Sequence, residues 1–335
     1  MQNNRVLITG GAGFIGSDLA YQLVAQGTKV TVVDNLVNGK RENLADLPED
    51  KCQLVITDIR DEQRMMALMQ GVDIVFHLAC LGVRHSIHSP HENHEVNATA
   101  TLKLLSIAKT VEVSRFVYVS SSEVYGTAKW VPMTEEHPTF PMTVYGSSKL
   151  AGECYTRAFY QTYGYQTVVI RPFNAYGPRC HHEGDSGEVI PKFLLRCLAD
   201  KPMIIFGDGN QTRDFTYVSD TARGILLAGL AENTIGQTIN LGSGSEITIN
   251  ELAQKVKTVV DRTNATILHE APRPGDVLRL YANTTQSQQL LGFKPQVTLL
   301  EGLTKLKEWY LNMEVSPEIL LEQELAYNWQ LKGSN

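Results

Sequence analysis

Apolar residues in the first half of the chain fall into two alternating kinds of segment. Short runs rich in valine, isoleucine and leucine are typical of buried strands, and apolar residues every three or four positions are typical of helices. The pattern predicts strands near residues 4–9, 29–33, 53–56, 73–78, 115–119 and 166–170, and helices near 14–26, 61–70, 91–111 and 144–163. This alternation predicts an α/β fold, a doubly wound parallel sheet with helices on both faces.

The alternation of strand and helix patterns ends at about residue 177, and beyond it glycine and proline break the chain into short segments. Because such residues favour turns, we expect a smaller C-terminal α/β lobe that binds substrate. The predicted large domain is 1–176, with the chain returning to it at about 213–243, and the lobe is 177–212 and 244–335. Residues 316–335 indicate a short helix followed by a frayed tail.

A glycine-rich turn lies between the first predicted strand and the first predicted helix. Strand, glycine turn and helix in this order are the context in which a dinucleotide-binding fingerprint is credible. The glycines allow a tight turn, and the helix N-terminus offers N–H groups to a pyrophosphate. We therefore expect a Rossmann domain whose dinucleotide contacts Gly10, Gly13, Phe14, Ile15 and Gly16.

The second predicted strand ends at Asp34. A carboxylate at this place binds both hydroxyls of an adenosine ribose and repels a 2′-phosphate, which favours NAD over NADP. Lys40 and Arg41 lie just beyond and weaken this preference slightly.

Tyr145 and Lys149 are four residues apart, so a helix carries them on one face, one turn apart. A tyrosine titrates near pH ~10, but a neighbouring ammonium or a cationic nicotinamide ring favours the phenolate. Such a phenolate can take a proton from an alcohol while hydride leaves the same carbon. Ser120 to Gly126 follow a predicted strand, and their hydroxyls and carboxylate should face the same cleft.

Composition narrows the range of partners. The 335 residues are 43% hydrophobic and 20% charged, and the net charge of −6 argues against a nucleic-acid or anionic-membrane partner. The five cysteines are scattered without a C-x-x-C pair, which favours a cytoplasmic protein without a disulfide framework or zinc site. No apolar run reaches membrane-spanning length.

Four histidines (85, 88, 91 and 94) recur at every third residue. This spacing drifts around a helix and Pro90 interrupts it, so we expect a solvated loop and helix start there and no metal.

These motifs together resemble the extended short-chain dehydrogenase/reductases that modify nucleotide-linked sugars, a group including UDP-glucose 4-epimerase and dTDP-glucose 4,6-dehydratase. The resemblance covers nearly the whole chain. Besides the glycine turn it is carried by Asp34-Asn35, Asp58 to Asp61, His77-Leu78-Ala79, Ser120 to Gly126, Tyr145 to Lys149, Arg171 to Pro178 and Gln211 to Phe215.

The resemblance implies a role for each matched position. Toward NAD it implies contacts from Asp34, Asn35, Asp58, Ile59, Leu78, Ala79, Tyr145 and Lys149. Toward the nucleotide sugar it implies Asn174, Val189, Arg213 and Arg273, of which the two arginines would otherwise be taken for surface residues. It implies that Ser121 bonds the 4-oxygen of the sugar, that Tyr145 takes its proton, and that the protein is a homodimer through helices 91–111 and 144–163.

The resemblance also orders the possible reactions. A 4,6-dehydratase of this group carries an Asp-Glu pair where this chain has Ser122-Glu123, and a hydroxyl is a poor acid toward water leaving C6. We therefore expect a UDP-hexose 4-epimerase acting through a transient 4-keto sugar. The alternatives are a 4,6- or 5,6-dehydratase using Glu123, then a UDP-glucuronate decarboxylase. A non-catalytic NAD sensor would be expected to lack the Tyr145–Lys149 pair. Glu123 has no evident task in an epimerase, and it could equally be a capping or solvated residue.

Overall fold

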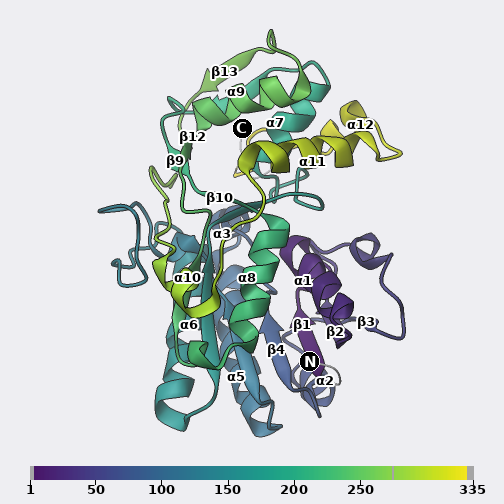
Figure 1. Cartoon of the computed structure of the whole chain (residues 1–335), viewed down its shortest axis with the longest axis vertical. Coiled ribbons are helices and arrows are strands. Elements are labelled where there is room, and N and C mark those ends of the chain that lie inside the picture. The colour runs from purple at the N-terminus through teal and green to yellow at the C-terminus, as the bar shows by residue number, and fades with distance from the viewer. Residues whose placement is uncertain (1–3, 274, 330–335) are drawn as a thin grey trace.

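The structure, a computed structural model, describes residues 4–273 and 275–329. A seven-stranded parallel sheet in the order β11-β6-β5-β4-β1-β2-β3 forms the core of the larger, lower part of the molecule in Figure 1. Its strands are β1 (Arg5–Thr9), β2 (Lys29–Asp34), β3 (Cys52–Ile56), β4 (Ile74–His77), β5 (Arg115–Val119), β6 (Thr167–Pro172) and β11 (Thr238–Leu241). The predicted α/β fold is therefore confirmed.

Helices cover both faces of this sheet because successive strand residues point in opposite directions. The flanking helices are α1 (Phe14–Ala25), α2 (Glu62–Met69), α5 (Ala100–Thr110), α6 (Val144–Tyr163) and α8 (Val218–Leu230). Val6 and Ile8 of β1 belong to the core under α1 and α8, whereas Leu7 belongs to the core under α2, α5 and α6.

The predicted helix at 91–111 is divided into three segments. They are α4 (Pro90–His94), the π-helical segment η2 (Glu95–Thr99) and α5. Ser89 is the N-cap residue of α4, although its side chain makes no capping hydrogen bond. The histidine-rich stretch before it, expected to be a loop, instead forms a short helix, α3 (Val83–His88).

The C-terminal lobe has its own core, which includes Phe193, Leu252 and Leu306. Its elements are α7 (Val189–Leu198), β8 (Met203–Phe206), α9 (Ile249–Val260), β13 (Ile267–Glu270), α11 (Leu299–Leu311) and α12 (Pro317–Leu321). Three short pairs of strands are formed by β8 with β13, β7 (Asn174–Tyr176) with β10 (Phe215–Tyr217), and β9 (Thr212–Arg213) with β12 (Ile247–Thr248).

The chain passes between the sheet and the lobe more than once. The chain leaves the sheet after β11, enters the lobe with α9, and then returns to the sheet. There α10 (Thr285–Leu291) packs on β11 and α8, and Phe293 lies in the same hydrophobic core as Ile225. The prediction of a frayed tail is wrong for 322–329, which pack against the lobe through hydrogen bonds with α7 and the loop at 184–187. The rest of the predicted tail, 330–335, lies outside the described residues.

Candidate active site

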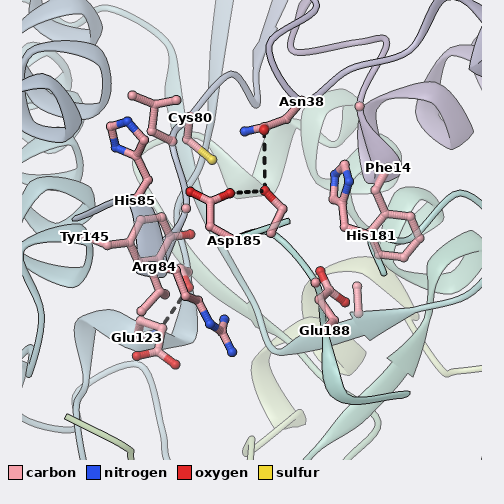
Figure 2. A pocket seen from close by; sticks show the side chains of 18 of the residues that line it. Phe14, Asn38, Cys80, Arg84, His85, Glu123, Tyr145, His181, Asp185 and Glu188 are labelled. Atoms are coloured by element: carbon pink, nitrogen blue, oxygen red, sulfur yellow. Dashed lines mark hydrogen bonds between the residues drawn. The ribbon is translucent and has the colours of Figure 1, made fainter. Parts of the chain in front are cut away.

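A cavity lies where the carboxyl ends of the sheet strands face the lobe (Figure 2). All of the predicted site residues line it: Gly10, Gly13, Phe14, Ile15, Gly16, Asp34, Asn35, Asp58, Ile59, Leu78, Ala79, Ser121, Ser122, Glu123, Tyr145, Lys149, Asn174, Val189, Arg213 and Arg273. The fold therefore brings together residues that are up to 263 positions apart, as expected for ligands of an open α/β sheet.

The glycine turn is packed so closely that side chains at Gly10 and Gly16 would not fit. Gly10 has φ of +70°, and a Cβ there would lie 2.7 Å from the amide nitrogen of Ala79. A Cβ on Gly16 would lie 2.2 Å from the carbonyl oxygen of Gly10. The turn therefore presses the N-terminus of α1 close to the strand ends, as a bound pyrophosphate requires, and these residues fit a dinucleotide.

Asp34 is held at the end of β2 by the turn itself. Its carboxylate accepts the amide N–H groups of Ala12 at 3.0 Å and Leu36 at 2.9 Å. Burial raises the pKa of Asp34 in spite of these two bonds. Lys40, which could have attracted a 2′-phosphate, instead pairs with Glu183 at 2.6 Å.

The start of α6 holds Tyr145 and Lys149. Thr143 caps the helix by accepting the amide N–H of Gly146 at 3.1 Å. Lys149 is 2% exposed, and its ammonium donates to the carbonyl oxygen of Val119 at 2.6 Å, which fixes it in the cavity wall.

The electrostatics of Tyr145 differ from the expectation that Lys149 favours a phenolate. Burial raises the pKa of Tyr145 well above its ordinary value, and the neighbouring Cys80 raises it further, as do the carboxyl groups of Glu123 and Glu188. A hydrogen bond with Ser121 lowers it. Burial also lowers the pKa of Lys149. The described residues therefore favour the protonated phenol, and a cation bound beside it would favour the phenolate.

The serine-rich segment after β5 forms one turn of 3₁₀ helix, η3 (Ser122–Val124). The Ser121 hydroxyl caps it by accepting the amide N–H of Glu123 at 3.2 Å. Ser122 is 3% exposed. Burial raises the pKa of Glu123, although Arg213 and Arg84 oppose this shift. Glu123 is thus a half-buried carboxyl group on the cavity wall.

Three further residues on the cavity wall, Cys80, Arg84 and Glu188, had no individual predicted role. Arg84 lies in α3 and points into the cavity beside Tyr145 and Glu123 (Figure 2). Burial raises the pKa of Glu188 to about 7, and Cys80 also faces the cavity. The only local signal was the acidic, glycine-rich composition around Glu188, because the helix carrying Arg84 has no clear periodicity.

The loop that carries Glu188 is joined to two parts of the large domain. One contact is the Lys40–Glu183 pair. In a second, His88 Nε2 lies 3.1 Å from an Asp185 carboxylate oxygen. The Ser186 hydroxyl donates to Asn38 at 3.4 Å (Figure 2). These contacts close the cavity on the side of the glycine turn.

The arginines predicted to hold a diphosphate lie on either side of one carboxylate. Arg213 pairs with Asp276 at 2.8 Å, and Arg273 approaches the same residue at 3.7 Å. Among the described residues, neither Nε of Arg273 nor Oδ1 of Asn174 has a hydrogen-bond partner although both atoms are buried. Because buried polar atoms are normally paired, these two are available to a polar ligand.

Within 4–273 and 275–329, no group of three or more histidine, cysteine or acidic side chains could hold a metal ion. No helix of the described chain is long and apolar enough to cross a membrane.

Known proteins are similar to this chain both in sequence and in fold. A family model described as GDP-mannose 4,6 dehydratase matches residues 7–306. A UDP-glucose 4-epimerase of Mycolicibacterium smegmatis is 36% identical over 312 residues, which is 92% of this chain and 99% of that protein. UDP-glucuronic acid decarboxylase 1 of Arabidopsis thaliana is 33% identical over 92% of this chain and 70% of its own length. The crystal structure of a dTDP-glucose 4,6-dehydratase from Streptomyces venezuelae with NAD bound has a TM-score of 0.86 at 34% identity, covering 92% of this chain and 97% of that one.

Proposed function

The chain belongs to the GDP-mannose 4,6-dehydratase family of extended short-chain dehydrogenase/reductases, and from this premise we propose that it is an NAD-dependent UDP-hexose 4-epimerase. The glycine turn, Asp34 and Asp58 would hold NAD, with Lys149 at the nicotinamide ribose. When bound, NAD supplies a hydride acceptor and donor for C4 of the sugar.

The chain's own residues handle the proton and the position of the sugar. Ser121 would hydrogen-bond the 4-oxygen, and Tyr145 would take the O4 proton and return it when the 4-keto sugar is reduced on its other face. The cationic nicotinamide ring would offset the burial that keeps Tyr145 protonated.

The substrate diphosphate would lie against Asn174, Val189, Arg213 and Arg273. The unpartnered buried atoms of Asn174 and Arg273 among the described residues support this placement. A guanidinium is suited to the task because its planar fork binds phosphate oxygens in pairs. The name of one relative, UDP-glucose 4-epimerase, supports a UDP-sugar as the substrate.

The observation that carries the choice of epimerisation is the buried hydroxyl of Ser122 beside Glu123. An epimerase needs no acid toward O6, and a hydroxyl cannot act as one at neutral pH. The test is the product formed from UDP-glucose, UDP-N-acetylglucosamine and UDP-glucuronate, followed by proton NMR. We expect inversion at C4. A deoxy-sugar methyl signal would reject an epimerase in favour of a dehydratase, and a pentose product would indicate a decarboxylase.

Dehydration is kept as a second candidate because two half-buried carboxyl groups with raised pKa values, Glu123 and Glu188, line the cavity. One could remove H5 while the other protonates the leaving 6-hydroxyl. If a deoxy product forms, Glu123→Gln and Glu188→Gln should each abolish it. Unchanged turnover in Glu123→Gln would exclude a role for that carboxyl in removing H5.

We further propose that the protein is a cytoplasmic homodimer that pairs through α4, α5 and α6. The five cysteines, all described as free thiols, support a reducing compartment. Helices α5 and α6 pack side by side on one face of the sheet, and Leu102 of α5 is 37% exposed there.

A further inference from the structure

The last described segment, 322–329, forms what we call the C-terminal strap. It follows α12 and lies beyond residue 306, where the match to the family model ends. Four residues of the strap line the cavity: Glu324, Ala326, Asn328 and Trp329. The strap therefore adds to the ligand site a wall that lies outside the matched region.

Polar contacts fix the strap to the elements that frame the cavity. Glu324 pairs with Arg196 of α7 at 3.0 Å, and Lys192 of the same helix donates to the carbonyl oxygen of Leu325 at 2.8 Å. The Asn328 amide, 3% exposed, donates to the carbonyl oxygens of Asp185 and Gly187, both at 3.1 Å. Anchors at both ends hold the strap in one position.

An aromatic corner is formed where the strap meets β8. The ring of Trp329 lies 4.7 Å from that of Phe206 and nearly perpendicular to it, at 87°. The Arg273 guanidinium lies 5.7 Å from the Phe206 ring and 5.9 Å from the Trp329 ring. Phe206, Trp329 and Arg273 all line the cavity.

The order of groups in a nucleotide sugar matches the order of groups in the cavity. A sugar at Tyr145 places its diphosphate at Arg213 and Arg273, and the nucleoside follows the diphosphate. The next surface beside Arg273 is the aromatic corner, and nucleobases stack on aromatic side chains. We infer that Trp329 contacts the nucleobase of the substrate, and that the strap is a specificity-determining part of the site. This inference rests on the proposed function, since it requires a nucleotide sugar as substrate.

The test is the affinity of the NAD-loaded protein for UDP alone, measured by calorimetry. Loss of one stacking partner should weaken UDP binding about 10-fold in Trp329→Ala, and Trp329→Phe should restore most of the affinity. Because this contact is remote from C4, KM should rise by a similar factor while kcat changes less than twofold. The control is Trp130→Ala, since Trp130 is 50% exposed and does not line the cavity.

A second measurement keeps the test valid if Trp329→Ala does not fold. The chain has three tryptophans, so Trp130→Phe with Trp309→Phe leaves Trp329 as the sole indole. UDP should quench its fluorescence. Equal UDP affinity in wild type and Trp329→Ala, or no quenching in a protein that binds UDP, would overturn the inference and leave the proposed function standing. Failure of wild type to bind UDP, dTDP or GDP would overturn both.

Discussion

At the scale of single residues, the site combines a phenol with surroundings that oppose its ionisation. Burial and two carboxyl groups raise the pKa of Tyr145, and Lys149 is occupied by a backbone carbonyl. In the proposed mechanism, the cationic nicotinamide ring would therefore be the group that favours the phenolate of Tyr145.

Tyr145→Phe tests the assigned base. We expect kcat to fall by about 10²- to 10⁴-fold, the usual contribution of acid–base catalysis, while NAD retained through purification stays the same. Tyr163→Phe is the matched control, because Tyr163 lies on the same helix and is 56% exposed. Turnover unchanged by Tyr145→Phe would remove the tyrosine from the mechanism.

Glu188 should make stability depend on pH. Its pKa is raised from 4.5 to about 7 in the folded protein, so between these values the folded state binds more protons than the unfolded chain. Its contribution to the free energy of unfolding is thus fully present below about pH 4.5 and is lost as pH rises through 7. Between pH 5 and pH 8, Glu188→Gln should gain stability relative to wild type by at most about 3 kcal/mol.

Urea denaturation of both proteins at pH 5 and pH 8 measures this gain. Glu112→Gln, an exposed carboxyl after α5, is the control and should follow wild type at both pH values. A constant difference between Glu188→Gln and wild type across this range would show that Glu188 titrates as an ordinary glutamate.

At the scale of elements, the strand–turn–helix unit at the N-terminus can be tested by adding one methyl group. A Cβ on Gly16 would meet the Gly10 carbonyl at 2.2 Å, so the turn must open and NAD retention should be lost. Gly164→Ala is the control: it strains the left-handed cap of α6 by about 1 kcal/mol, and no other atom lies within 4 Å of the added carbon. Gly16→Ala protein that keeps its NAD would contradict the assigned cradle.

The elements that were predictable from the sequence are those with a strong local pattern. The strands of the first half and α1, α2 and α6 agree with their predicted positions within two residues, because each buries an unbroken or periodic apolar face. Helix α3 was missed because six residues rich in histidine provide too short a pattern. The strap was missed because its order depends on Arg196, Lys192 and the loop at 185–187, which are distant in sequence.

The same contrast applies to the site. Tyr145 and the glycine turn belong to local motifs, in which the spacing of residues along the chain indicates their chemistry. Arg84 and Glu188 belong to none, and only the folded chain reveals that they face the same cavity as Tyr145. Their positions on the cavity wall and the raised pKa of Glu188 are consequences of packing between the lobe and the sheet, which a linear pattern does not encode.

At the scale of the whole molecule, both the sheet domain and the lobe supply residues to the cavity wall. NAD would lie along the strand ends, and the nucleotide sugar would lie along the lobe. The proposed dimer surface includes α6, the helix that carries Tyr145, so pairing would support the geometry of the base.

Sedimentation equilibrium tests the proposed dimer. Wild type should behave as a dimer, and Leu102→Glu should shift it toward monomer by placing a charge in the apolar contact. Leu311→Glu on α11 is the control, because Leu311 is 56% exposed on the lobe. A monomeric wild-type protein would reject the dimer without affecting the assignment of the site.

The most direct measurement follows deuterium in UDP-glucose labelled at C4. A 4-epimerase removes this label from C4 and returns it to the same carbon, so the product should be UDP-galactose with deuterium retained at C4, without added cofactor. Deuterium in a methyl group at C6 would identify a dehydratase, and UDP-galactose that has lost the label to solvent would contradict hydride transfer through bound NAD.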